Sequence, residues 1–360
     1  MFDQTTDALE WQKLLGLLGG HARSSRGAAL ARAGILAPDL SQASRFQRLT
    51  TELANIHNGP DSIPLQAFPD VEASVRRASK GAVLEAYELR DHAMVLAVWD
   101  DVYRFLQRHS QDAPALVASA SALSAANDLR PLKAALNASV QSDGAINESA
   151  TPELRRLTAH ANELKQHIRH RLEDILHSQR YEDLLQERYF AEREGRYVLP
   201  IKVDMQRRVP GIVHDVSASG ATVFIEPREL VDLNNAIKVA DREIDREVMR
   251  ILRELSGRIA EQADVIVAGL NALAELDVVA ARAAFGRQLQ AHPVSLNDEG
   301  RIRLRQARHP LLVLSKPRVV ANDLVLDDQI QVLVISGPNT GGKTVALKIV
   351  GLFALMARSG

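Results

Sequence analysis

Residues 332–344 read Val332-Leu333-Val334-Ile335-Ser336-Gly337-Pro338-Asn339-Thr340-Gly341-Gly342-Lys343-Thr344, and this stretch decides how the last part of the chain is expected to fold. The apolar, β-branched run 332–335 is typical of a parallel strand that is buried on both faces. Residues 343–358 follow without a proline and carry apolar side chains at helical spacing. Gly360 suits the left-handed residue that ends a helix. Strand, glycine-rich loop and helix in this order predict a phosphate-binding loop.

Each residue type in the loop suits the binding of a phosphate group. Glycines let successive backbone N–H groups point inward, so that they form an anion site at the positive end of the following helix. Lys343 is expected to reach the β- and γ-phosphates, and Thr344 to hold Mg²⁺ through its hydroxyl. The expected cofactors are ATP or ADP with Mg²⁺, and the alternative is a glycine turn of structural use only. The candidate cofactor-binding residues are Gly337, Pro338, Asn339, Thr340, Gly341, Gly342, Lys343 and Thr344.

Length and composition narrow the class of protein. A chain of 360 residues is long enough for two or three domains of about 150 residues each. Lys and Arg number 44 against 45 for Asp and Glu, so any contact with nucleic acid must come from a local patch. There is no cysteine, which excludes disulfides and thiolate chemistry. No secretory signal and no long apolar run occur, so we expect a cytoplasmic protein with no membrane partner.

The first 150 residues alternate helical segments with polar or proline-bearing turns, which indicates an α-helical scaffold. Thr151-Pro152 gives a helix start, a cap followed by proline, and a helix of roughly 35 residues is expected from there. Residues 229–292 contain no proline, and a continuous helix from 229 to 290 would be roughly 90 Å long. The glycines at 257, 269 and 286 are the points where it could bend or break. Both segments carry narrow apolar stripes, which predicts that they pack against each other as antiparallel arms.

The sequence between the two arms has a different pattern. Four short apolar segments separated by glycine-containing turns predict antiparallel strands at 188–190, 196–203, 211–215 and 222–225. We call residues 188–228 the β module. Its basic residues outnumber its acidic ones, which leaves two interpretations open, a patch that contacts nucleic acid and an ordinary solvated surface. The candidate nucleic-acid contacts are Arg193, Arg196, Lys202, Arg207 and Arg208.

The predicted fold class is mainly α with a small β insertion, followed by the start of an α/β P-loop ATPase domain. The expected organisation is an α-helical core over 1–150, a first lever helix over 151–187, a β-rich clamp over 188–228, a second lever helix over 229–292 that returns to the core, and an incomplete P-loop ATPase domain over 293–360.

Several motifs together resemble one family. Gly337-Pro338-Asn339-Thr340-Gly341-Gly342-Lys343-Thr344-Val345 resembles the nucleotide loop of the MutS family. The fuller run is similar to the bacterial subgroup that bears a Smr domain, and the resemblance covers essentially the whole chain. The segments similar to that subgroup's clamp are Gly195-Arg196-Tyr197-Val198-Leu199-Pro200, Gly211-Ile212-Val213-His214-Asp215, Ser217-Ala218-Ser219-Gly220-Ala221-Thr222, and Glu226-Pro227 through Leu233-Asn234-Asn235. The segments similar to its core signature and to the entry of its ATPase domain are Glu275-Leu276-Asp277-Val278-Val279-Ala280 and Arg308-His309-Pro310-Leu311-Leu312.

The resemblance implies a homodimeric, DNA-binding ATPase whose arms carry clamps around nucleic acid. It also implies an endonuclease activity in the Smr domain, and roles in suppressing homologous recombination, in acting on collided ribosomes through rRNA, or in both. By this resemblance, three parts of the family would all lie beyond Gly360: the acidic strand that holds the metal-bound water, the signature that reaches across the dimer, and the Smr domain. We therefore expect no catalytic residue in this portion and no useful rate of ATP hydrolysis by it.

A second hypothesis comes from a different class of protein. The arms could be rods for partner proteins in a helical scaffold or assembly module, with the nucleotide loop only setting the conformation. The salt dependence of nucleic-acid binding separates the two hypotheses, because contacts between arginine and phosphate weaken steeply with salt.

Overall fold

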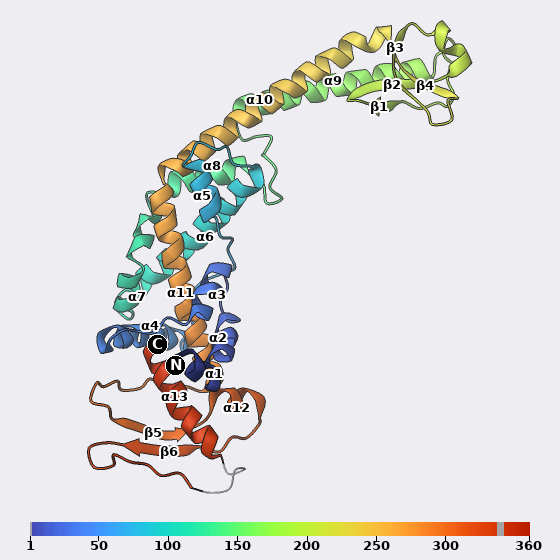
Figure 1. Cartoon of the computed structure of the whole chain (residues 1–360). Helices are drawn as coiled ribbons and strands as arrows, with labels where there is room; N and C mark the ends of the chain where they lie inside the picture. Colours follow the sequence, from blue (N-terminus) through green and yellow to red (C-terminus); the bar gives the residue numbers. More distant parts are fainter. Residues whose placement is uncertain (1, 337–341) are drawn as a thin grey trace. The chain divides into compact units, whose positions relative to one another are not determined.

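The computed structural model describes residues 2–336 and 342–360, and the chain divides into two compact units (Figure 1). The core unit comprises residues 1–82, 90–134 and 258–360, and the arm unit comprises residues 83–89 and 135–257. The described residues are mostly helical, with one four-stranded and one two-stranded sheet. The predicted mainly α fold with a small β insertion is therefore confirmed. None of the helices in the described ranges is both long and apolar enough to cross a bilayer.

Most of the helices belong to the core unit. A central helix, α11, packs against α2, α3, α4 and α5, and its apolar residues are buried around the whole circumference, as expected of a helix enclosed by others. Gly269 lies inside α11 because a Cβ there would come within 1.9 Å of the Trp99 ring on α6. Besides the last turn of α10 (Val231–Glu261), the helices that lie wholly or partly in this unit are α1 (Phe2–Ala8), α2 (Trp11–Gly19), α3 (Ser25–Ala33), α4 (Leu40–His57), α5 (Glu72–Ala78), α6 (Ala86–Arg108), α7 (Pro114–Ser119), η1 (Ser121–Ala126), α8 (Arg130–Ser139), α11 (Ala263–Leu289), α12 (Pro310–Ser315) and α13 (Lys343–Ser359).

The arm unit holds the β module on two helices, α9 (Pro152–Leu176) and α10 (Val231–Glu261), which run side by side in Figure 1. The sheet order is β1-β2-β4-β3, and every neighbouring pair is antiparallel. One face of the sheet packs on both helices, with side chains such as Leu172, Ile225 and Ile237 in one buried cluster. The strands are β1 (Ala191–Arg193), β2 (Arg196–Lys202), β3 (Gly211–Val216) and β4 (Thr222–Pro227), with short 3-10 turns at η2 (Val203–Arg208) and η3 (Arg228–Leu230).

Three predicted boundaries in the arms were wrong. Helix α9 ends at Leu176 after 25 residues, because the chain then turns so that Tyr181, Leu184 and Leu185 can join the buried cluster. The first strand lies at 191–193 and not at 188–190. The second helix breaks at Gln262, where φ is −105° and ψ is 16°, whereas Gly257, Gly269 and Gly286 all lie inside helices.

In the last part of the chain, the predicted helix forms but the predicted strand does not. Helix α13 is present, and Gly360 at its end has a φ of 89°. The strand predicted at 332–335 does not form, and Val332 and Val334 are 78% and 82% exposed. A parallel strand buried on both faces needs neighbours, but among the described residues β5 (Ile302–Ala307) and β6 (Asn322–Leu326) pair only with each other, antiparallel.

Candidate functional site

The described part of the predicted nucleotide site is the N-terminus of α13. Gly342 has a φ of 84°, a left-handed conformation that glycine adopts without strain, and its carbonyl accepts the N–H of Ala346 at 3.0 Å. Lys343 and Thr344 are half-buried and exposed, respectively, and the described residues contain no hydrogen-bond or ion-pair partner for either side chain. Both side chains and the positive end of a 17-residue helix therefore suit a phosphate and its Mg²⁺. The other predicted loop residues, Gly337, Pro338, Asn339, Thr340 and Gly341, lie outside the described residues.

Helix α13 is held firmly in the core unit. Ile349 and Leu352 are fully buried. One turn after Thr344, the Lys348 ammonium lies 2.9 Å from the Glu10 carboxylate, and this hydrogen bond lowers the pKa of Glu10. At the other end, the Arg358 guanidinium donates to the carbonyl of Ala37 at 2.7 Å. The helix that begins at the predicted phosphate site is thus tied to the α-helical core at both ends.

A hollow of about 410 Å³ lies beside the first turn of α13. His309 is buried in its wall, burial lowers the pKa of its imidazole, and in the described structure Nδ1 has no hydrogen-bond partner. The lining combines apolar side chains with a few polar groups, as in many small-molecule sites. The lining residues are Glu10, Lys13, Leu17, His309, Leu311, Leu312, Leu314, Ser315, Thr344, Val345 and Lys348.

Two of the five predicted nucleic-acid contacts brace the β module itself. The Arg193 guanidinium lies 3.0 Å from the Asp215 carboxylate and stacks over the Phe224 ring, 4.4 Å from its centroid. Arg196 donates to the Glu226 carboxylate at 2.6 Å and to Asn235 Oδ1 at 2.7 Å. Because these guanidinium groups already have partners, they offer fewer free donors to a phosphate.

The other three predicted contacts lie at the end of β2 and on the turn that follows it. Lys202 Nζ donates to the carbonyl of Asp183 at 3.1 Å. Arg207 and Arg208 are exposed on η2, and the one contact of their head groups in the described structure joins Arg208 Nη1 to Met205 Sδ at 3.7 Å. Arg207 and Arg208 are therefore the guanidinium groups of this set that are most available to a phosphate backbone.

The motif residues of the β module converge on one buried carboxylate, Glu226. Its oxygens accept from Arg196 Nη1 at 2.6 Å, from His214 Nε2 at 2.6 Å and from Asn234 Nδ2 at 3.0 Å. Asn234 also accepts from the N–H of Tyr197 and donates to its carbonyl. The network joins β2, β3 and β4 to the first turn of α10. The motif segments in the sequence contained all these residues, Glu226 included, but they did not show that the hydrogen bonds meet at the Glu226 carboxylate.

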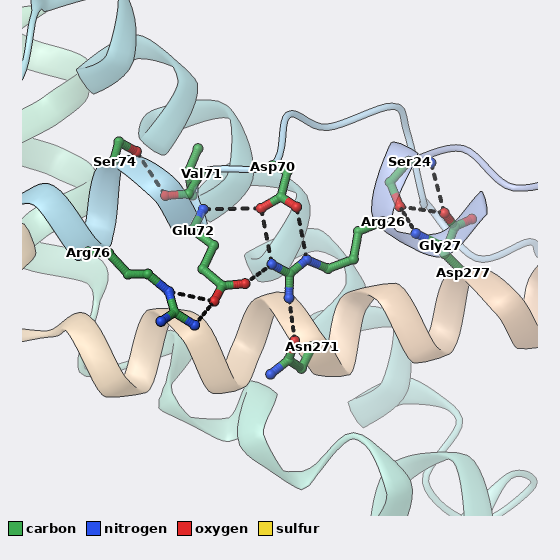
Figure 2. Close-up of polar contacts among 10 residues, drawn as sticks. All are labelled: Ser24, Arg26, Gly27, Asp70, Val71, Glu72, Ser74, Arg76, Asn271 and Asp277. Carbon is green, nitrogen blue, oxygen red and sulfur yellow. Dashed lines mark hydrogen bonds and ion pairs between the residues drawn. The ribbon is translucent and has the colours of Figure 1, made fainter. Parts of the chain in front are cut away.

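A second buried carboxylate, Asp277, lies in the core unit on α11 (Figure 2). It accepts the backbone N–H groups of Arg23 and Ser24 at 2.9 and 2.8 Å, and the Ser24 hydroxyl at 2.7 Å. Ser24 is the N-cap of α3, so Asp277 lies at the positive end of that helix. Gly27 makes the approach possible, because a Cβ there would lie 2.2 Å from Asp277 Oδ2. In the sequence, Asp277 stands in the segment Glu275-Leu276-Asp277-Val278-Val279-Ala280 that resembles the family's core signature, but nothing in that segment indicates that its carboxylate accepts from the start of α3.

Beside it, Arg26 connects three helices of the core unit, α3, α5 and α11, and the loop before α5 (Figure 2). Its guanidinium pairs with Asp70 and Glu72, and it donates to Asn271 Oδ1 on α11. The hydrogen bond from Arg26 lowers the pKa of Glu72. Sequence reasoning did not find this cluster, because its members are separated by as many as 245 positions in the chain.

No protein-family model matches the chain. Comparison with known proteins finds relatives that cover almost all of it. The chain is 38% identical over 356 residues to the endonuclease MutS2 of Pelotomaculum thermopropionicum, which is 98% of this chain and 44% of the relative. It is 36% identical to the endonuclease MutS2 of Shouchella clausii and 38% identical to that of Thermomicrobium roseum, in each case over 98% of this chain and 45% of the relative.

The chain thus spans less than half the length of the curated relatives it matches. Within that span the likeness is continuous, from the helical core through the β module to α13. The resemblance predicted from the motifs is therefore confirmed: over the length they share, this chain is a relative of the MutS2 proteins, the second subgroup of the bacterial MutS family.

Proposed function

We propose that this chain forms part of a MutS-type, ATP-dependent nucleic-acid clamp, with a nucleotide site at residues 337–344 and a nucleic-acid contact on the β module. The observation that supports it best is the likeness to proteins named endonuclease MutS2 along almost the whole chain. Endonucleases act on nucleic acids, and the β module exposes Arg207 and Arg208. DNA is the first substrate to test, and ribosomal RNA is the alternative.

The nucleotide would be held by the N-terminus of α13. Lys343 would contact the terminal phosphates, and Thr344 would bind Mg²⁺, which offsets phosphate charge when it is present. Because Lys348 and Arg358 of α13 bind Glu10 and Ala37, a shift of the helix on nucleotide binding would move these contacts with the α-helical core. We further propose that the parent protein is a homodimeric ATPase with its nuclease in a segment outside this chain.

Nucleotide binding is tested by titration with a fluorescent ATP analogue in the presence of Mg²⁺. Lys343→Ala is expected to weaken binding at least tenfold, because charge-assisted hydrogen bonds to phosphate are lost. Lys348→Ala is the matched control, since it removes a lysine from the same helix whose partner is Glu10. Equal affinity of the wild type and Lys343→Ala would refute the site.

Nucleic-acid binding is tested by its salt dependence. The double variant Arg207→Ala/Arg208→Ala is expected to weaken binding to branched DNA and to lower the slope of log K against log salt by about 2, one for each phosphate contact. Arg155→Ala/Arg156→Ala, an exposed pair on α9, changes the net charge equally and is the control. A slope that both double variants lower equally would show that Arg207 and Arg208 make no specific contact. Absence of nucleic-acid binding at low salt would favour the scaffold hypothesis instead.

A further inference from the structure

The ties between α13 and the α-helical core differ in strength along the helix. At its end, a Cβ added to Gly360 would lie 2.6 Å from the Cβ of Phe46. Midway, a Cβ added to Gly351 would lie 2.8 Å from both terminal carbons of the Leu9 side chain. At the start, a Cβ added to Gly342 would meet no atom of the described residues within 4 Å. The core therefore approaches the end and the middle of α13 closely and leaves space at its start.

The polar contacts show the same difference. The N–H of Ala37 donates to the carbonyl of Arg358 at 2.8 Å, and the Arg358 guanidinium returns a bond to the carbonyl of Ala37. Closer to the start, Lys348 is joined to Glu10 by an ion pair whose side chains are 27% and 41% exposed. Water screens an ion pair that is partly exposed, so this tie yields more easily than the one at Arg358.

The hollow of about 410 Å³ borders the start of α13. Its wall includes Thr344 and Val345 from the first turn of this helix, Leu17 from α2 and Leu312 from α12. A close-packed interior resists small displacements, because every atom that moves meets another. Beside a hollow this resistance is absent, so the first turn can move toward α2 while the last turn stays in place. The sheet of β5 and β6 would move with it, because Ile349 shares a buried cluster with both strands.

Two residues in the wall of the hollow favour a second arrangement. His309 is 3% exposed, and its Nδ1 has no hydrogen-bond partner in the described structure, which is unfavourable for a buried polar atom. Lys348 lines the same hollow, and its ammonium has three donors, of which one goes to Glu10. Glu10 has a φ of 57°, a left-handed conformation that is strained for a residue with a side chain. An unpaired polar atom and a strained residue together are typical of segments that change conformation.

Lys13 provides an attraction that would bring the walls together. Lys13 on α2 and Thr344 on α13 both line the hollow, and the Lys13 side chain is 66% exposed. Phosphates bound at the start of α13 would attract the Lys13 ammonium across the hollow. The acidic side chain of the wall, Glu10, is already paired with Lys348 and opposes this attraction only weakly.

We propose that α2 and the start of α13 close the hollow when phosphates bind, with the last turn of α13 as the fixed end. The proposal rests on the proposed nucleotide site and adds to it a conformational response. Its consequence is that Leu9 and Glu10, which form the turn between α1 and α2, pass the nucleotide state on to the α-helical core.

Thiol labelling tests the closure, because the chain has no cysteine of its own. Leu17→Cys places a thiol in the wall of the hollow, and Ile35→Cys, at a residue that is 55% exposed and outside the wall, is the control. The probe is magnesium tripolyphosphate, which has neither base nor ribose, at a concentration that displaces the fluorescent ATP analogue. It is expected to slow the alkylation of Leu17→Cys by iodoacetamide about fivefold, through a shift toward the closed state, and to leave Ile35→Cys unchanged.

The outcomes separate the closure from the nucleotide site on which it rests. If magnesium ATP does not bind, the nucleotide site is refuted and the closure with it. If ATP binds but neither ATP nor tripolyphosphate slows Leu17→Cys, the closure alone is refuted. Slowing by ATP and not by tripolyphosphate would also refute the closure, because the base and ribose would then be filling the hollow.

A pair of variants tests the cause of the closure. Lys13→Gln in the Leu17→Cys protein removes the ammonium that phosphates attract, so the slowing by tripolyphosphate is expected to be largely lost. Lys13→Arg keeps the positive charge and is expected to keep the slowing. Equal slowing in the two variants would refute the attraction by Lys13, and with it the closure as proposed.

Discussion

Two fully buried carboxylates, Asp277 in the core unit and Glu226 in the β module, are stabilised in different ways. Both side chains are 0% exposed, and an ionised carboxylate without partners would be too costly to bury. Asp277 takes its hydrogen bonds from the start of a helix, two backbone N–H groups and the N-cap serine. Glu226 takes its hydrogen bonds from three side chains, Arg196, His214 and Asn234.

The difference decides how visible each site is in a sequence. Backbone donors are present whatever the residue, so the site of Asp277 demands only a serine cap and the absence of a Cβ at Gly27. Side-chain donors demand particular residues, so the site of Glu226 leaves a motif spread over three strands and a helix. The motif that contains Asp277 therefore includes none of its donors, whereas the motif segments of the β module include all three side-chain donors of Glu226.

The largest effect is expected at Asp277. Asp277→Ala removes the acceptor of two backbone N–H groups and of the buried Ser24 hydroxyl, and it should lower the free energy of unfolding of the core unit by about 4 kcal/mol. Both tryptophans, Trp11 and Trp99, belong to this unit, so fluorescence during urea denaturation reports it. Asp277→Asn, which keeps the shape, should cost less. Equal losses in the two variants would contradict this expectation, because they would mean that keeping the shape and one acceptor oxygen at position 277 does not help.

A smaller effect is expected at Glu226. Glu226→Gln leaves the Arg196 guanidinium without its buried counter-charge and should destabilise the β module by about 3 kcal/mol. Hydrogen exchange of peptides covering residues 191–227 measures this locally. Arg196→Met/Glu226→Gln, which removes the charge on both sides, should recover part of the loss. If the double variant were as damaged as the sum of the single ones, charge pairing would not be the cause.

The smallest effect is expected at His92, a buried titratable side chain that is kept uncharged instead of being paired with an opposite charge. This buried imidazole has a hydroxyl partner, Ser74, at 2.9 Å, and burial lowers its pKa to about 4. Since the folded protein disfavours the charged ring, stability is complete above the unfolded pKa near 6.5 and is lost as pH falls toward 4. Between pH 7.5 and pH 5 the wild type should lose about 2 kcal/mol more than His92→Gln, by tryptophan-monitored urea denaturation. An equal loss in both proteins would place the pH sensitivity elsewhere.

Local patterns in the sequence predicted some elements well and others poorly. Helix α13, the strands β2, β3 and β4, and the pairing of α9 with α10 follow from periodicity and turn chemistry. The strand predicted at 332–335 was wrong because a buried parallel strand depends on neighbours and not on its own residues. The break at Gln262 was not predicted. The glycines at 257, 269 and 286 were the expected break points, but all three lie inside helices.

The sequence by itself determined the order of the elements, the likeness to the MutS2 proteins over the shared length and the candidate nucleotide loop, because each depends on contiguous residues with a fixed spacing. Tertiary structure alone decided which acids are buried and which of five basic residues are free. It also decided which end of α13 borders a hollow. Those properties depend on burial and on partners far away in the chain, and hydrogen bonds between distant residues leave no local pattern to find.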